Sequence, residues 1–418
     1  MNSDIKKNRM TDVVLTILKP DGAPLANQEV TVEQTNHKFL FGTAAFDLVP
    51  LTSGDYSGEK KELAEQRAEK IAALFNAATL PFYWGRFEPK RGGPITEKVK
   101  NAARWSLEHN MVTKGHPLCW HTVTADWLLE LSNAEILQAQ LDRIHRDVAD
   151  FKGLIDMWDV INEAVIMPVF DKYDNGITRI CKEHGRINTI RMMFDAARET
   201  NPTATLLIND FDVSSAYDIL VEGCLEAGIK FDVIGIQSHM HQGWWGVEKT
   251  MKVLENFERF HLPIHFTETT LVSGHLMPPE IVDLNDYQVT DWPSTPEGEE
   301  RQAEQAIQHY KTLFSHPLVE GVTWWDSSDG GWLNAPAGLI RKDGSVKPAY
   351  DELMKLIKGD WWLPPTKIIT NTNGQIQLRC FSGEYNLKYG GYKETFTVTK
   401  EGASNNSQFM IHMKNIEK

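Results

Sequence analysis

Two glutamates stand out because each directly follows a short apolar, strand-like stretch. Glu163 follows Trp158–Asn162, and Glu268 follows Leu262–Thr267. They lie roughly 100 residues apart, which fits about three strand–helix units of ~30 residues each. Hydrolysis of a glycosidic bond needs a pair of carboxyl groups, one protonated and one ionised. The residue types and their spacing therefore predict chemistry on a sugar linkage.

A barrel of parallel strands would bring both glutamates to one substrate, because all its strands end on the same rim. From Phe39 onward, short apolar strands alternate with longer helical segments. We expect barrel strands that end near residues 43, 79, 116, 162, 209, 237, 267 and 325. We expect helices at residues 58–75, 97–109, 133–151, 186–200, 217–227, 247–260 and 297–314. The fold class is therefore predicted to be α/β, with a (β/α)8 TIM barrel over residues 38–358.

Both ends of the chain depart from this pattern. Residues 12–34 read as two half-buried strands around a turn-rich stretch, as in a hairpin or meander. Residues 366–413 read as about five short strands, with a loop at residues 401–407. Neither end can bury a complete core alone, so we expect residues 1–37 and 359–418 to form one accessory β-sandwich.

The composition bounds the kind of partner. The 418 residues include 57 acidic and 43 basic side chains, for a formal net charge of −14. An acidic surface repels polyphosphates, which argues against nucleic acid and favours a neutral ligand. Several of the 13 tryptophans lie beside the candidate catalytic segments. Because an indole face can stack on the C–H face of a sugar, a carbohydrate is the expected partner.

Cysteine usage and the chain start give few further signals. The four cysteines have no short-range spacing typical of a disulfide framework or a zinc site. No stretch approaches the length of a membrane span, and the polar first residues lack the apolar core of a signal peptide. We expect no membrane partner, and a location either in the cytoplasm or outside the cell after removal of a signal. The oligomeric state is not indicated.

Polar residues next to the two glutamates fit the same chemistry. Asn162, directly before Glu163, could donate its amide to a sugar hydroxyl. Gln237 and His239 end the preceding strand and could hold an ionised Glu268, which would lower its pKa. Glu163 needs the opposite environment, and an aromatic neighbour such as Trp158 could supply it by excluding water.

Several segments occur in the order and spacing of glycoside hydrolase family 10, which is best known for endo-β-1,4-xylanases. They are Lys114–His121, Trp158–Ala164, Ile234–His239, Phe266–Glu268 and Lys347–Tyr350. The resemblance covers about residues 38–358 and implies a (β/α)8 barrel, no cofactor, no metal, and hydrolysis with retention of anomeric configuration. It implies that Glu163 is the acid/base and Glu268 the nucleophile. The residues it places around the sugar are His116, Trp120, Asn162, Gln237, His239, Trp325 and Trp332.

One region departs from that family's pattern. Members usually carry a Glu-Asn pair and then a Lys that hold the non-reducing side of the substrate, whereas this chain has Pro81–Trp84 there. We expect Trp84 and Arg86 to contact substrate instead, although Arg86 could equally pair with Glu88. Loss of groups that hydrogen-bond sugar hydroxyls strongly changes which substrate a site prefers. The predicted substrate is therefore β-1,4-xylan or xylo-oligosaccharides, and the alternative is a short glycone or a disaccharide glycoside with an apolar aglycone.

Two other classes of function remain to be weighed. His116, His121, His239 and His241 could be cast as metal ligands, but no matching acid cluster accompanies them, and such sites need three or more convergent ligands. A catalytically silent carbohydrate-binding protein would keep the tryptophans but has no need of both carboxyl groups. Replacing Glu268 by Ala separates this class from an enzyme, because only an enzyme would lose turnover.

Overall fold

The computed structural model describes residues 3–400 and 408–412. The chain divides into two compact units. One consists of Phe41–His309 and Leu318–Tyr350, and the other of Met1–Leu40, Tyr310–Pro317 and Asp351–Lys418. The domain boundaries expected at residues 37 and 358 stay a prediction.

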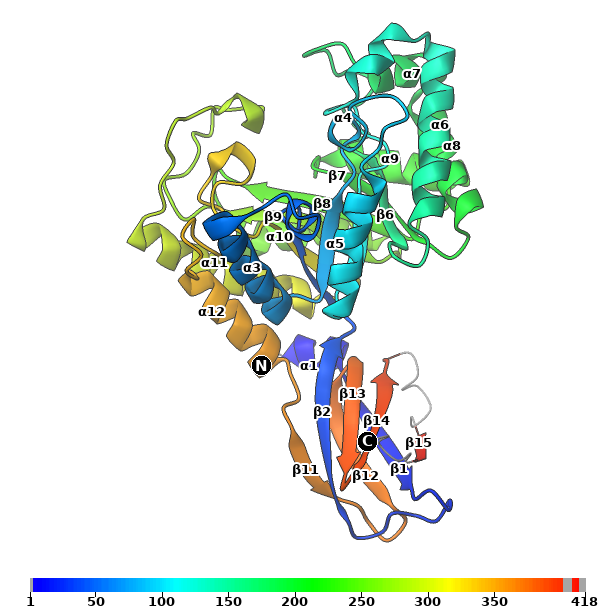
Figure 1. Ribbon diagram of the computed structural model, residues 1–418, viewed down its shortest axis with the longest axis vertical. Helices are drawn as coiled ribbons and strands as arrows, with labels where there is room; N and C mark the ends of the chain where they lie inside the picture. The colour runs from blue at the N-terminus through cyan, green and yellow to red at the C-terminus, as the bar shows by residue number, and fades with distance from the viewer. Residues whose placement is uncertain (1–2, 401–407, 413–418) are drawn as a thin grey trace. The chain divides into compact units, whose positions relative to one another are not determined.

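The first unit is a closed barrel of eight parallel strands, as the alternation in the sequence predicts (Figure 1). The strands are β3 (Leu40–Ala44), β4 (Ala77–Pro81), β5 (Val112–His116), β6 (Met157–Asn162), β7 (Thr205–Asp210), β8 (Val233–Met240), β9 (Ile264–Leu271) and β10 (Val319–Asp326). They follow chain order around the barrel, and β10 closes it against β3. The carboxyl ends of all these strands therefore meet at one rim, where barrel enzymes carry their sites.

Helices follow the barrel strands. They are α2 (Leu48–Thr52), α3 (Gly58–Leu74), α4 (Trp84–Phe87), α5 (Thr96–Glu108), α6 (Asn133–Asp150), α7 (Gly176–His184), α8 (Arg186–Thr200), α9 (Ser215–Glu226), α10 (Gly246–Glu258), α11 (Pro296–Ser315) and α12 (Pro348–Lys355). Shorter helical turns are η1 (Asp126–Glu130), η2 (Leu284–Asp286), η3 (Trp332–Asn334) and η4 (Leu356–Asp360). Helices α5, α6 and α10 bury apolar residues along one face. Helix α6 begins with a capping box, in which Ser132 and Glu135 satisfy each other's backbone N–H groups. The expected helices are confirmed, whereas α7 and the short α2 and α4 were not foreseen.

The second unit holds two sheets built from both ends of the chain. One has the order β12-β1-β15 and the other β11-β2-β13-β14. Their strands are β1 (Met10–Leu18), β2 (Glu29–His37), β11 (Thr366–Ile369), β12 (Gln375–Phe381), β13 (Gly383–Tyr389), β14 (Tyr392–Val398) and β15 (Gln408–His412), and α1 (Ser3–Arg9) precedes them. Both sheets contribute to one core, for example Leu15 and Val32 from the N-terminal strands and Ile376 and Leu387 from the C-terminal strands. This confirms the accessory sandwich.

The expected N-terminal hairpin is wrong. Strands β1 and β2 belong to opposite sheets, and each pairs with C-terminal strands instead. Each strand must turn its apolar face toward the shared core. Two strands in opposite sheets can both do this, because the two sheets face each other across that core. The loop expected at residues 401–407 lies outside the described residues.

The described residues contain no helix long and apolar enough to cross a membrane. The four cysteines are free and buried.

Candidate active site

The two glutamates are carried by strands β6 and β9 at the carboxyl-end rim. Glu163 directly follows β6, and Glu268 lies within β9. Glu163 has a φ of 58°, in the left-handed region that non-glycine residues rarely adopt. Its backbone N–H donates to the carbonyl oxygen of Asn209 at 2.8 Å, which ties this turn to the neighbouring strand β7. The unusual backbone conformation sets where the carboxyl group points, and such strain is characteristic of functional sites.

Glu268 is surrounded by donors and by two histidines. Asn209 Nδ2 donates to Oε1 at 2.9 Å, and His239 Nε2 lies 3.0 Å from Oε2. His116 Nε2 lies 3.8 Å from Oε1. Burial alone would raise the pKa of Glu268, but His116 and His239 outweigh it and hold that pKa below its ordinary value. Glu268 is therefore ionised at neutral pH and available as a nucleophile.

The two histidines are themselves held in place on their far nitrogens. His116 Nδ1 lies 2.7 Å from Asp159 Oδ2, and Lys114 Nζ lies 2.8 Å from the same oxygen. His239 Nδ1 forms a 3.0 Å hydrogen bond with Thr270 Oγ1. Because the partner of one ring nitrogen fixes the orientation of the other, both Nε2 atoms are directed toward Glu268.

Glu163 has a different environment. Trp120 Nε1 donates to Oε2 at 2.8 Å, Asn162 Nδ2 donates to Oε1 at 3.2 Å, and Gln237 Nε2 lies 3.4 Å from Oε1. The side chain is 14% exposed. Burial raises the pKa of Glu163 to about 8, against the Trp120 hydrogen bond and with help from the charge of Asp210. Glu163 is therefore protonated near neutral pH and can act as a general acid.

Neutral amides link the two carboxyl groups. Asn162 Oδ1 accepts from Asn209 Nδ2 at 2.7 Å and from Gln237 Nε2 at 3.0 Å. A Cβ atom at Gly235 would lie 2.5 Å from Asn209 Oδ1, so a glycine is needed there for Asn209 to reach its position. Gln237 was expected beside Glu268, but its hydrogen bonds go to Asn162 and Glu163.

Aromatic rings surround this centre. Trp325 lies 5.2 Å from the His116 ring and 6.0 Å from His239, and Trp332 lies 4.6 Å from His239, all between ring centroids. Trp120, through its hydrogen bond, lies beside Glu163. The residues expected around the sugar are thus brought together. Trp158, by contrast, is fully buried among Phe82 and Phe151, so Trp120 is the indole in hydrogen-bond contact with Glu163.

Tyr83 and Asp210 lie near the glutamates without having been foreseen. The Tyr83 ring lies 5.6 Å from His116 and 5.5 Å from Trp120. Burial and the charge of Glu268 raise the pKa of Tyr83 well above 10, so its hydroxyl stays neutral. Asp210 accepts from the backbone N–H of Val165 at 2.9 Å, and burial raises its pKa to about 7. In the sequence, Asp210 is marked only by its place at the end of β7. Tyr83 is marked only by its place in the stretch after β4.

Trp84 and Arg86 are not brought to the glutamates. Trp84 is 4% exposed, and its indole donates to Glu88 at 3.2 Å. The guanidinium of Arg143 lies 4.8 Å from the Trp84 ring. Arg86 is exposed, with its guanidinium 5.6 Å from the Tyr83 ring. Glu88 pairs with Arg146 at 2.9 Å, so the alternative partner considered for Arg86 is occupied.

The histidines considered as metal ligands have other contacts. Within the part of the chain that the structure describes, no group of three or more His, Cys, Asp or Glu side chains is arranged to hold a metal. His121 packs on Phe170 at 4.5 Å, and burial lowers its pKa to about 4. His241 packs on Trp332 at 5.1 Å, and burial lowers its pKa to about 3. Both histidines are therefore neutral members of the aromatic surroundings.

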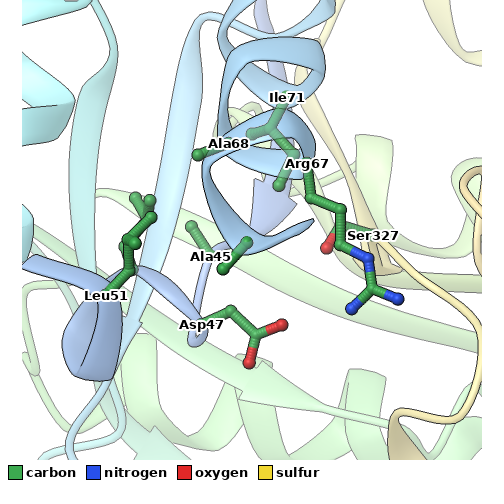
Figure 2. A pocket seen from close by; sticks show the side chains of 9 residues that line it. Ala45, Asp47, Leu51, Arg67, Ala68, Ile71 and Ser327 are labelled. Carbon is green, nitrogen blue, oxygen red and sulfur yellow. The ribbon is translucent and has the colours of Figure 1, made fainter. Parts of the chain in front are cut away.

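A separate pocket lies where α2 and α3 approach the ends of β3 and β10 (Figure 2). Ala45, Leu51, Ala68 and Ile71 give it an apolar lining, and Arg67 lies at its edge. It contains neither glutamate, so it is a packing gap beside the barrel and not part of the candidate site.

Comparison with known proteins identifies the family. The model of "Glycosyl hydrolase family 10" matches residues 49–356. Endo-1,4-beta-xylanase C of Paenibacillus barcinonensis is 25% identical over 81% of this chain and 33% of its own length. Endo-1,4-beta-xylanase B of Thermotoga neapolitana is 29% identical over 49% of this chain and 61% of its own length. The chain thus spans between a third and about three fifths of these relatives.

A solved structure shows the same fold. Xylanase 10B from Thermotoga petrophila RKU-1, crystallised in complex with xylobiose, superposes with a TM-score of 0.62 at 22% identity, over 77% of this chain and 95% of that one. The barrel, the paired glutamates on its rim and the family match together show that this chain belongs to glycosyl hydrolase family 10.

Proposed function

We propose that this chain is a retaining β-glycoside hydrolase that cleaves β-1,4-xylan or xylo-oligosaccharides. The observation that carries the proposal is the opposite charge state of two glutamates on one rim. Histidines keep Glu268 ionised, while burial keeps Glu163 protonated. Retaining glycosidases need this combination of nucleophile and acid. The xylanase names of the relatives and the xylobiose bound by the solved relative support the choice of sugar.

The first step forms a covalent intermediate. A carboxylate oxygen of Glu268 attacks the anomeric carbon while the bond from that carbon to the leaving oxygen breaks. The bonding electrons go to the leaving oxygen, which takes the proton of Glu163. Asn162 donates to Glu163, and in this proposal its amide also donates to a hydroxyl of the same sugar.

The second step releases the sugar. Glu163, now ionised, takes a proton from water, and the water oxygen attacks the anomeric carbon. The bond to Glu268 breaks, and its electron pair restores the carboxylate. Two displacements at one carbon leave its configuration unchanged. This mechanism needs no cofactor.

A shifted specificity is the second candidate. Tyr83 lies within Pro81–Trp84, the stretch that departs from the polar pattern of the family, and the Phe46 ring lies 5.7 Å from Tyr83 and 5.5 Å from Trp325. An aromatic wall has fewer donors for sugar hydroxyls than the polar residues it replaces. This favours a short glycone or a disaccharide glycoside with an apolar aglycone.

The deciding experiment is product analysis by mass spectrometry. Wild type and Glu268→Ala are incubated with xylan, xylo-oligosaccharides, aryl β-glycosides and β-diglycosides. Xylobiose and xylotriose from polymer support the xylanase proposal, whereas cleavage of one aryl glycoside alone supports the shifted specificity. Binding of sugar by both proteins without any cleavage would instead identify a carbohydrate-binding protein. Proton NMR of the first product then tests retention, since an inverted anomer would contradict the two-step mechanism.

A further inference from the structure

A single lysine joins the loops that follow the two glutamates. Loop 163–175 leads from β6 to α7, and loop 272–295 leads from β9 to α11. Strands β7 and β8 lie between β6 and β9 in the barrel, so the two loops leave the rim at separate places. Lys172 Nζ nevertheless lies 2.7 Å from Asp283 Oδ2 and 2.5 Å from Asp286 Oδ1. The three side chains, named here the loop bridge, therefore connect two loops across the mouth of the barrel.

The acidic end of the loop bridge is fixed to the candidate site. Asp283 caps the turn η2 and Asp286 is its last residue, in loop 272–295, the yellow-green stretch at the upper left of Figure 1. This loop has a small core of its own, in which buried Met277 and Trp292 pack with residues 335 and 337. Between the two aspartates, Asn285 Oδ1 accepts from Trp332 Nε1 at 3.0 Å. The aspartates are thus attached to an indole that also packs on His239.

The loop that carries the basic end is linked to Glu163 through aromatic contacts. In loop 163–175, Phe170 packs on His121 at 4.5 Å and on Tyr173 at 4.8 Å. His121 Nε2 lies 4.0 Å from Glu163 Oε2. Burial raises the pKa of Tyr173, and so do the charges of Glu163 and Asp283, so this tyrosine lies within electrostatic reach of both. Lys172 directly precedes Tyr173, so the loop bridge begins next to this ring, which Phe170 and His121 connect to Glu163.

The reaction mechanism indicates which part of the substrate lies on the side of Glu163. The acid protonates the leaving oxygen, so the leaving group extends from the cleaved bond past Glu163. The groups on this side are the half-exposed Tyr173 ring and the loop bridge. A long leaving group would have to pass beneath the loop bridge or displace it, whereas a short one would not.

We infer that Lys172, held by Asp283 and Asp286, closes the leaving-group side of the cleft and favours substrates with a short leaving group over the interior of a polymer. The favoured class is an aryl xyloside or a xylo-oligosaccharide cut near its end. The choice of xylose-based substrates rests on the proposed function, whereas the closure by Lys172 does not. Exposed ion pairs are individually weak and are screened by salt, so the closure is reversible.

The first test measures the closure without any substrate. Spin labels are placed through Val169→Cys and Val282→Cys, which are 65% and 98% exposed in the two loops, while the four native cysteines are buried. Pulsed EPR is expected to give a short, narrow distance distribution that lengthens and broadens with Lys172→Glu or high salt. The triple exchange Lys172→Glu with Asp283→Lys and Asp286→Lys should restore it. A distribution unaffected by Lys172→Glu would overturn the inference.

The matched control is an exposed ion pair away from the loops. Arg259 and Glu222 join α10 to α9 at 2.9 Å and are 43% and 46% exposed, much as Lys172 and Asp283 are 45% and 38% exposed. Arg259→Glu should leave the distance distribution unchanged. An equal change in this variant would assign the effect to net charge and would also overturn the inference.

The second test measures substrate choice in the same variants without spin labels. Lys172→Glu is expected to raise the ratio of kcat/KM for xylan to kcat/KM for an aryl xyloside by fivefold or more, and the triple exchange to reverse this. Loops that open with no change in the ratio would overturn the effect on substrate choice. A wild type that cleaves no xylose-based substrate would contradict the proposed function, and the inference about substrates would then fall with it. The EPR result alone would still decide the closure.

Discussion

Glu163 and Glu268 are the same residue type on the same barrel rim, yet their surroundings give them opposite charge states. Two histidines and an asparagine face Glu268, and the histidines lower its pKa. An indole and two amides face Glu163, and its burial raises its pKa. The difference shows that the neighbours of each glutamate, and not the glutamate itself, set its charge state.

Removing the ionised member should have the largest effect. Glu268→Ala is expected to lower kcat by about 10⁴-fold or more, because no other group can form the covalent intermediate. Steady-state assays on an aryl xyloside measure this, with exposed Glu226→Ala in α9 as the control. A loss of less than tenfold in Glu268→Ala would mean that Glu268 is not the nucleophile.

Removing the protonated member should have a smaller effect that depends on the leaving group. Glu163→Gln is expected to lower kcat/KM by about 10²–10⁴-fold for xylo-oligosaccharides, which need a proton on the leaving oxygen. Aryl xylosides with acidic phenols need less protonation of the leaving oxygen, so the rate of bond cleavage should fall less for them. Burst kinetics with such a substrate measure that step. Equal losses for good and poor leaving groups would argue against an acid role.

The pH dependence tests the same assignment. In the wild type, kcat/KM should fall as pH rises through about 8, because Glu163 then loses the proton that it must donate. Asp210→Asn removes a charge that raises the pKa of Glu163, so the fall should move to lower pH. Trp120→Phe removes a hydrogen bond that lowers the same pKa, so the fall should move to higher pH. We expect the fall in kcat/KM to move by up to about one pH unit in each variant. Movement in the same direction in both variants would contradict the assignment of this fall to Glu163.

The smallest expected effect concerns stability. Because the pKa of Glu163 is raised from 4.5 to about 8, the folded protein binds more protons than the unfolded chain between these values. Stability from this residue is therefore lost as pH rises from about 4.5 to 8. Glu163→Gln should gain a few degrees in Tm relative to wild type at pH 9, but not at pH 4. Differential scanning calorimetry at both pH values checks the sign. His145→Gln, on the exposed side of α6, serves as a control.

Local patterns were enough to predict the barrel and its two glutamates. Apolar stretches with polar ends identify the strands, and a strand's end fixes its place on the rim. The same patterns do not say which side chain faces which. The register of β8 and β9 places Gln237 opposite Glu268, but its side-chain amide is directed to Asn162 and Glu163. Asn209 gains its role only because β7 sets it beside Asn162.

The remaining differences have similar causes. Trp84 is a suitable type for stacking on sugar, but it begins α4 and packs with Arg143. Alternation of apolar and polar residues predicts β1 and β2 as strands, but it does not predict which strands they pair with. Lys172 reaches Asp283 and Asp286 from irregular loops more than 100 residues away in sequence. Such pairings depend on tertiary structure and leave no periodic signal.

The exchange of strands between the two ends of the chain has a consequence for biosynthesis. Met10 pairs with Phe381 and Val32 with Leu387, so the first strands leave the ribosome long before their partners are translated. Until then, β1 and β2 have no sheet to complete and present unpaired strand edges, which invite association between nascent chains. The whole barrel is translated in that interval, so the sandwich can only be completed after the last strands emerge.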